Sequence, residues 1–241
     1  MSKLRFFLVA VLLVLLLGCI GGRPGVTRVD FELITVMKEG STYRAVVFVR
    51  SVEPRESIPA SAFSVATRNG IFFLDSENVS FLGLEGAPYI EEGRIFVITL
   101  RKGDGYFWIY PTHYDVAIEG HLLVVVGNLT EEEAGEMSHS LKPPIFPKHS
   151  VAYKDGRLFL LEDTGFGKAG EVISGFKEEE ATGMGNLTLR EGYSLKRITI
   201  EGEGGSVQEI TVAVYKGSRG FWVEPGNEEQ RSFLFPGAEG S

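Results

Sequence analysis

Two aspartates are the side chains of this sequence best placed for acid–base chemistry. Asp163 opens the tripeptide Asp-Thr-Gly behind the apolar run 158–161, and Asp75 opens Asp-Ser-Glu behind the run 71–74. Two carboxylates that share one proton can activate a water molecule for attack on a carbonyl carbon. This chemistry requires the two aspartates to lie side by side, so the strands in front of them must bring them together.

The first tripeptide resembles the Asp-Thr/Ser-Gly signature of the aspartic peptidases, duplicated β proteins in which each half supplies one carboxylate. The resemblance implies a surface hydrolase that uses Asp75 and Asp163. Three departures weaken it: Glu77 replaces the glycine, Glu162 stands where an apolar residue is usual, and the aspartates are two positions out of register. The sequence therefore favours a non-catalytic protein with no assigned catalytic residue, and the hydrolase is the alternative.

An aromatic stripe is the second candidate. Tyr106, Trp108 and Tyr110 alternate with Phe107 and Ile109 in a predicted strand, so the three larger rings share one face. We expect the Phe107 face to be core. If the other face is open, its rings could stack on sugar rings or anchor a protein partner. Packing against the rest of the chain is the alternative.

Metal, cofactor and nucleic-acid functions find little support. The four histidines, at 113, 121, 139 and 149, lack a tight ligand spacing, so we expect no metal and no cofactor. The segment 165–170 matches a Gly-x-Gly-x-x-Gly phosphate loop, but no helix pattern follows, and we interpret it as a flexible loop. The net charge of -8 would repel phosphate, which makes nucleic acid an unsuitable partner.

The N-terminus predicts export. Lys3 and Arg5 precede twelve consecutive apolar residues at 6–17. A helix of that length spans about 18 Å, which is short of the roughly 30 Å hydrocarbon core of a bilayer. A cleaved signal peptide over 1–18 therefore fits better than a membrane-spanning helix.

The apolar run ends in Leu16-Leu17-Gly18-Cys19, which contains the only cysteine of the chain. It resembles the lipobox of secreted bacterial and archaeal lipoproteins. The resemblance implies cleavage before Cys19, a lipid on its sulfur, and attachment to the outer face of the cell membrane. Residues 19–27 would form the tether, and the partners would be the membrane and an unknown extracellular ligand or envelope protein. A plain signal peptide or a short anchor, with an incidental cysteine, is the alternative.

Two compositional features agree with export. Three of the five asparagines, Asn78, Asn128 and Asn186, lie in Asn-x-Ser/Thr sequons, which are glycosylation sites on exported proteins in hosts that use them. Chance is the alternative, because five is a small sample. Scarce amides and a single cysteine fit a thermophilic source, although biased codon usage would give the same composition.

The rest of the chain predicts β-structure. Val29, Phe31 and Leu33 alternate with Asp30 and Glu32, which indicates a strand with its acidic side toward solvent and its apolar side buried. Asn69-Gly70 and Asp155-Gly156 each separate two strand-like runs and favour type I′ hairpin turns. One helix is expected to begin at the cap Thr130 and to end before two prolines at 143–144.

The two halves of the chain resemble each other. Residues 64–74 align without gaps on 150–160 with six identities, and 102–111 align on 216–225 with five. We interpret this as a duplicated β unit, although hairpins resemble one another by chance.

The predicted fold class is all-β: two tandem, duplicated antiparallel sandwich-like units with one short linking helix, or alternatively one large pseudo-symmetric sandwich. The expected boundaries are a first β domain at 28–129, a helix and Pro-rich linker at 130–147, a second β domain at 148–235 with an insertion near 162–192, and a tail at 236–241.

Overall fold

The computed structural model describes residues 25–54, 57–120, 122–127, 132, 143–182, 187–202, 205–224 and 227–237. The expected signal peptide, most of the tether and nearly all of the expected helix at 130–142 lie outside these residues. Among the described residues, no helix is long and apolar enough to cross a membrane.

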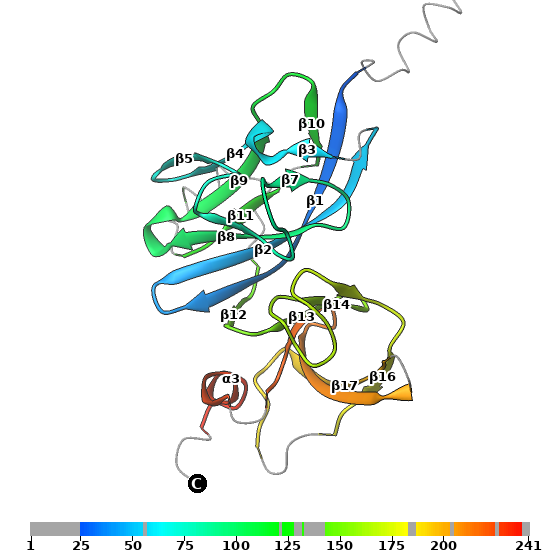
Figure 1. The fold of residues 1–241 in the computed structure, drawn as a ribbon. Helices are drawn as coiled ribbons and strands as arrows, with labels where there is room; N and C mark the ends of the chain where they lie inside the picture. The colour runs from blue at the N-terminus through cyan, green and yellow to red at the C-terminus, as the bar shows by residue number, and fades with distance from the viewer. Residues whose placement is uncertain are drawn as a thin grey trace, which may run out of the picture.

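The long strand β1 (Thr27–Glu39) contacts both halves of the molecule (Figure 1). It pairs with β2 (Thr42–Glu53) along one edge, antiparallel. Along its other edge it pairs in parallel with β10 (Val116–Glu119) and with β12 (Ile145–Pro147). Every residue from Phe31 to Met37 is buried. Continuous burial in a strand requires that both faces of its sheet be covered.

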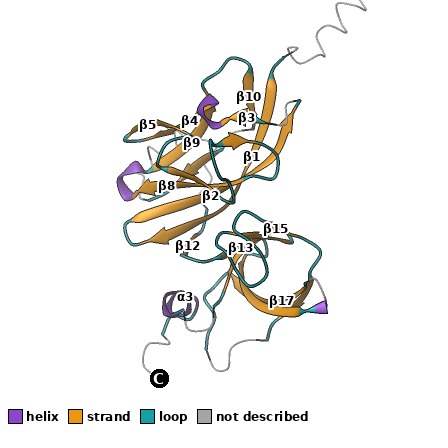
Figure 2. Cartoon of the chain, viewed as in Figure 1, coloured by secondary structure: helices purple, strands orange, loops and turns teal. Residues whose placement is uncertain are grey.

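The upper body in Figures 1 and 2 consists of two stacked sheets, of which one contains β1 and the other covers one face of it. The six-stranded sheet has the order β10-β1-β2-β8-β6, with β12 also on β1, and the four-stranded sheet has the order β11-β9-β4-β5. Phe31 of β1 packs edge-on against Phe63 of β4, with ring centroids 5.4 Å apart, so the core lies between these sheets. The bounds of the remaining elements in this body are β3 (Ile58–Pro59), η1 (Ala60–Ala62), β4 (Phe63–Thr67), β5 (Gly70–Phe73), β6 (Val79–Phe81), β7 (Tyr89–Ile90), β8 (Ile95–Arg101), η2 (Lys102–Asp104), β9 (Tyr106–Pro111) and β11 (Leu123–Val125).

The second half is one curved seven-stranded sheet, β15-β14-β13-β19-β18-β17-β16, with a helix packed on it (Figure 1). The core on its concave side includes Val151 of β13 and Val214 of β18. On the other side, Phe221 of β19 packs with Leu234 of the helix. The bounds are β13 (Val151–Lys154), β14 (Arg157–Leu160), β15 (Val172–Ile173), β16 (Lys177–Glu180), β17 (Tyr193–Glu201), β18 (Val207–Tyr215), β19 (Arg219–Trp222) and α3 (Glu228–Leu234).

The second half covers the other face of the six-stranded sheet. Ile34 and Met37 of β1 pack with Ala152 of β13, Phe159 of β14 and Leu161. We call this contact between the two halves the seam. Because the seam is a buried apolar cluster, it holds the halves together by the same hydrophobic effect that stabilises each core.

Two register shifts in the β1–β2 ladder supply residues to the seam. Ile34 of β1 and Arg50 of β2 each fall between paired positions, as in β-bulges. Before the bulge Phe31 and Leu33 face the inner core, and after it Val36 does, while Ile34 and Met37 face the second half. The bulge therefore changes which residues point to each side of a sheet that is buried on both faces.

The all-β, sandwich-like prediction is confirmed. Three details differ from it. Part of the expected linker is strand β12, and the first sheet contains parallel pairs, because β1 is long enough to accept two short strands on one edge. The helix α3 was not predicted; Asn227 caps it by accepting a hydrogen bond from the Gln230 N–H at 3.1 Å.

Of the two predicted type I′ hairpin turns, one is confirmed and the other is wrong. Asp155 and Gly156 have φ of 49° and 75°, as the predicted type I′ turn requires. In the first half, Thr67 pairs with Gly70, so Arg68 and Asn69 are the central turn residues, and Asn69 is not at positive φ. The type I′ prediction at Asn69-Gly70 is therefore wrong, although the hairpin exists.

A similar three-strand arrangement occurs in both halves. The order is β5-β4-β9 in the first half and β14-β13-β19 in the second. The pairing differs by one position, because Ala66 lies opposite Trp108 whereas Ala152 lies opposite Phe221. The duplication itself stays a prediction.

The glycine-rich segment after β14 forms a hydrogen-bonded turn that packs against the first half. The Thr164 N–H donates to the Gly167 carbonyl at 2.9 Å, and the Asp163 carboxylate accepts from the Ala169 N–H at 3.0 Å. A Cβ at Gly170 would lie 2.8 Å from the Leu82 carbonyl oxygen, so the two backbones meet closely. This turn is thus a part of the seam rather than the free loop expected.

Gly170→Ala should weaken the seam. Gly170 has a φ of +92°, and the added methyl group would meet the backbone of Leu82. Gly175 has a similar φ of +83°, but nothing lies within 4 Å of its Cβ position. We expect Gly175→Ala to lower the free energy of unfolding by about 1 kcal/mol through backbone strain, and Gly170→Ala by about 2 kcal/mol more. Denaturant titrations measure both; equal losses would contradict the close contact.

Candidate functional site

The aromatic stripe lies on the outer face of the four-stranded sheet. Phe107 and Ile109 are buried in the core, as predicted. Trp108, on the opposite face of β9, is 48% exposed, and Tyr106 and Tyr110 are half-buried. The Trp108 and Tyr110 rings meet edge to face with centroids 5.9 Å apart. The sequence thus predicted both the core face and the shared face of the larger rings.

The register of neighbouring strands adds two apolar side chains to this face. Across β4, Ala66 lies opposite both Trp108 and Ile71, and Ser64 lies opposite both Tyr110 and Phe73. Ile71 is 67% exposed and Phe73 54%. We call Ile71, Phe73, Tyr106, Trp108 and Tyr110 the aromatic face. Sequence analysis missed Ile71 and Phe73, because their direction depends on which strands pair.

This face can make apolar and stacking contacts. Five large hydrophobic side chains are exposed among the described residues, and three of them, Ile71, Phe73 and Trp108, belong to the aromatic face. Isolated exposed apolar residues are ordinary, whereas a contiguous set on one sheet marks a contact surface. Large aromatic side chains are also the ones that most often dominate binding free energy at interfaces.

The two aspartates considered for catalysis do not form a pair. Asp75 is exposed and follows β5 of the four-stranded sheet, whereas Asp163 follows β14 of the seven-stranded sheet. The Asp163 carboxylate accepts a hydrogen bond from Lys168 Nζ at 2.9 Å, and this contact, with the Ala169 N–H, lowers the pKa of Asp163. A shared proton would raise the pKa of one partner. Within the described residues no hydrogen bond joins Asp75 to Asp163.

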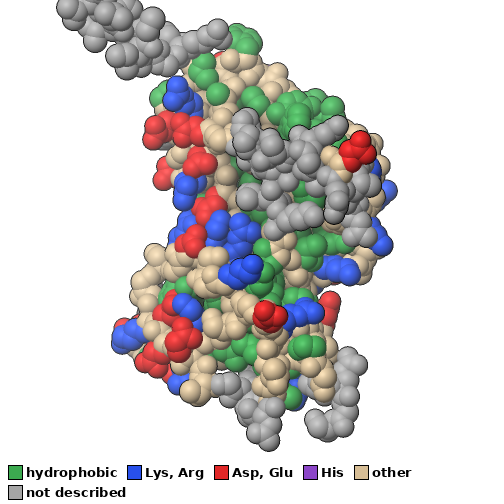
Figure 3. Space-filling view, turned by 180° about the vertical axis from the view of Figure 1, so that it is seen from behind, with side chains coloured by type: hydrophobic (Ala, Val, Ile, Leu, Met, Phe, Trp, Pro, Cys, Tyr) green, Lys and Arg blue, Asp and Glu red, His purple; other side chains and the backbone are tan. Residues whose placement is uncertain are grey.

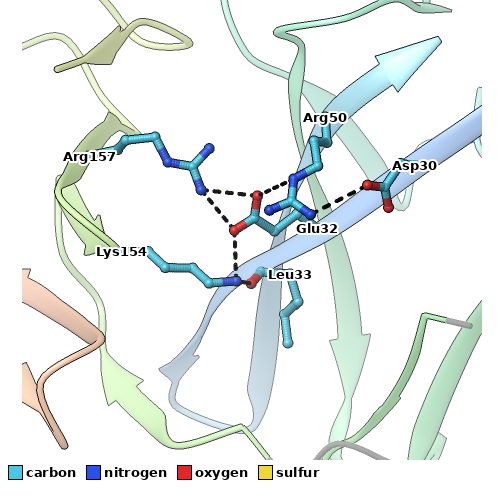
Figure 4. A network of polar contacts seen from close by, with 6 residues as sticks. All are labelled: Asp30, Glu32, Leu33, Arg50, Lys154 and Arg157. Carbon is cyan, nitrogen blue, oxygen red and sulfur yellow. Dashed lines mark hydrogen bonds and ion pairs between the residues drawn. The ribbon is translucent and has the colours of Figure 1, made fainter. Parts of the chain in front are cut away.

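A buried glutamate lies at the edge of the seam (Figure 4). Glu32 of β1 is only 9% exposed. Its carboxylate accepts hydrogen bonds from Arg157 Nη2 at 2.8 and 3.0 Å and contacts Lys154 Nζ at 2.9 Å. Lys154 Nζ also donates to the Leu33 carbonyl at 2.7 Å. Sequence analysis placed Glu32 on the solvent side of a half-buried strand; the second half covers it instead.

Arg50 of β2 lies 3.7 Å from the Glu32 carboxylate, and the cations that the second half brings near Glu32 come from strands that lie side by side. Arg157 of β14 is opposite Lys154 of β13, which is opposite Arg219 of β19. Three like charges in a row repel one another, so the row requires an anion. Burial alone would raise the pKa of Glu32, but the hydrogen bonds from Lys154 and Arg157 outweigh it and lower that pKa. Figure 3 shows Lys and Arg side chains gathered at the waist between the halves.

A shallow hollow of about 240 Å³ lies on the second half, beside α3. Its wall includes His149, which is 4% exposed, and the half-buried Trp222. The remaining lining residues are polar or charged: Lys148, Ser150, Glu162, Glu224, Asn227, Glu229 and Gln230. Because Ser150 donates to Glu162 at 3.0 Å, no serine–histidine pair is formed here.

His149 is held neutral by its surroundings. Burial is the largest influence and lowers the pKa of His149 to about 4. Nδ1 lies 2.6 Å from the Pro147 carbonyl oxygen, so Nδ1 carries the hydrogen, and Nε2 is buried without a partner among the described residues. Phe221 packs beside the ring, with centroids 5.3 Å apart. These contacts suit a core residue that fixes the β12–β13 connection.

The remaining predicted sites are only partly within the described residues. Asn78 lies in the half-buried turn before β6, and its carbonyl accepts a hydrogen bond from the Thr99 N–H at 2.8 Å. Cys19, Asn128 and Asn186 lie outside. Across the described ranges, no three His, Cys, Asp or Glu side chains gather as a metal ion would require.

Comparison with known proteins adds no family: no protein-family model matches this chain, and no curated protein matches it.

Glu32→Gln should destabilise the protein strongly. The change leaves Lys154 and Arg157 without their counter-charge at the edge of the seam, and breaking one side of a buried ion pair costs about 3 kcal/mol. Glu201, whose carboxylate pairs with Lys177 at 2.7 Å on the surface, provides the control Glu201→Gln, for which we expect little change. Denaturant unfolding measures both variants; a small effect at Glu32 would contradict the role of the network.

Acidification should unfold the protein partly through His149. Its pKa is about 4 in the folded chain and 6.5 in the reference state, so the unfolded chain takes up the proton first as the pH falls. Stability from this residue is complete above pH 6.5 and decreases by about 3 kcal/mol down to pH 4.

The matched variant is His149→Phe, which keeps a ring in the core without a titrating nitrogen. Unfolding free energies measured over this pH range should fall less steeply for His149→Phe than for the wild type. Parallel curves would show that His149 does not titrate as described.

Proposed function

We propose that this chain is a lipid-anchored, non-catalytic binding protein on the outer face of the cell membrane, with the aromatic face as its contact surface. The export and anchoring parts derive from the signal-like run 6–17 and from Cys19 in its lipobox-like setting. The binding part extends the predicted aromatic stripe, and the structure supports it. The observation that carries it is the clustering of Trp108, Ile71 and Phe73 on one exposed sheet face.

The chemistry of this face favours a protein partner over a glycan. A sugar needs several hydrogen-bonding groups beside the ring on which it stacks. The aromatic face offers only the hydroxyls of Tyr106 and Tyr110, because the residues flanking Trp108 across the sheet are Ala66 and Leu123. The further neighbours, Ile71 and Phe73, are apolar as well. An apolar patch on an envelope protein is the better complement, because its burial removes water from both surfaces.

Trp108→Ala should weaken partner binding at least tenfold, because a central tryptophan typically contributes 2 kcal/mol or more to a protein interface. The full chain is screened against extracytoplasmic envelope proteins and, in parallel, against envelope glycans, with affinity measured for each hit. Tyr114→Ala is the matched control, since Tyr114 is 98% exposed and is not part of the aromatic face. Equal binding by both variants would contradict the proposed surface, and glycan binding lost in Trp108→Ala would change the partner class.

Mass spectrometry of the membrane-extracted protein tests the anchor separately. The expected species begins at Cys19 and carries acyl chains on it. An unprocessed chain that begins at Met1 with a free thiol would overturn the anchor without affecting the binding test.

A further inference from the structure

The strand β5 is an edge of the four-stranded sheet on which no described strand pairs apart from β4. It is last in the order β11-β9-β4-β5. A free edge presents backbone donors and acceptors to which another strand can pair. The backbone of β5 is therefore a further contact surface beside the aromatic face.

The register identifies the groups that point outward. Thr67 pairs with Gly70 across the turn, and the Leu74 N–H donates to the Phe63 carbonyl at 3.1 Å. Because bonding direction alternates along a strand, the N–H and C=O of Ile71 and the N–H of Phe73 point away from β4. The Phe73 carbonyl accepts from the Ser76 N–H at 3.1 Å, so this end of the edge is closed.

Another edge of the same molecule shows the usual protection. β16 is the edge of the seven-stranded sheet and consists of Lys177 and three glutamates, all exposed. Charged side chains on an edge strand prevent pairing with other strands. β5 instead has the sequence Gly-Ile-Phe-Phe, with Ile71 and Phe73 exposed. The contrast indicates that β5 is an edge on which pairing is tolerated.

We propose that two copies of this chain associate by antiparallel pairing of β5 with β5. The edge is self-complementary: Ile71 has both an outward donor and an outward acceptor, so a two-fold axis beside Ile71 lets each Ile71 N–H donate to the partner's Ile71 carbonyl.

The charges agree with this pairing. Antiparallel pairing about Ile71 brings position 68 opposite position 74 of the partner, so Arg68 approaches the partner's Asp75. The two four-stranded sheets become one continuous sheet, and the aromatic faces of the two copies join. This inference stands on β5 alone and does not require the proposed anchor or ligand.

The first test is the mass of the full chain in detergent micelles, measured by light scattering or sedimentation with the detergent subtracted. We expect the wild type to be a dimer. Ile71→Lys places a charged side chain on the edge strand, as in β16, and should raise the dimer dissociation constant at least tenfold. Val207→Lys is the matched control, because Val207 is 60% exposed at the start of β18. A monomeric wild type, or a dimer that Ile71→Lys leaves intact, would overturn the proposal.

The second test is oxidative cross-linking in the Cys19→Ser background, which contains no other cysteine. Ile71→Cys should form a disulfide-linked dimer, and Val207→Cys should not. Equal cross-linking at both positions would overturn the β5 interface. Trp108→Ala separates this inference from the proposed function, since it should reduce partner binding and leave the dimer mass unchanged.

Discussion

Burial of both faces of β1 is the constraint on which the rest of this structure depends. One face packs with the four-stranded sheet through Phe31 and Phe63. The other has Ile34 and Met37, which would be exposed if the first half stood alone. Apolar side chains of this size each contribute about 1.5–3 kcal/mol when they are removed from water. The second half is therefore required to complete the packing of the first, and the two β units are not independent.

The same constraint explains the charges at the seam. Covering β1 removes Glu32 from water, which is costly for a carboxylate without partners. The type I′ turn at Asp155-Gly156 places Lys154 and Arg157 directly opposite each other at the end of the hairpin. Two adjacent cations repel each other, and a buried carboxylate without partners is destabilising. When Lys154 and Arg157 contact Glu32, the opposite charges compensate both effects. The hydrophobic contact drives docking, and the charges select one position for the hairpin on β1.

The sequence predicts those features that depend on residues close together in the chain, and it misses those that depend on distant residues. The Asp155-Gly156 turn and the alternation around Trp108 depend on neighbouring residues, and both are confirmed. The burial of Glu32 depends on a hairpin more than 120 residues away, so its acidic character indicated a solvent face. The helix α3 had a usable local signal, the Asn227 cap followed by two glutamates. At the sites, the pairing of β4 with β5 revealed Ile71 and Phe73, which no spacing in the sequence could place.

One outer face of the first half is covered by the rest of the chain, and the other is exposed. The outer face of the six-stranded sheet is covered by the second half, whereas that of the four-stranded sheet exposes Trp108. Trp222, the counterpart of Trp108 in the proposed duplication, packs edge-on against Phe166, with centroids 5.7 Å apart. The segment after β14 that supplies Phe166 corresponds to the predicted insertion of the second half. If the halves arose by duplication, Trp222 gained the Phe166 segment as a cover and became a structural residue. Trp108 has no such cover among the described residues and stayed available for contact with another molecule.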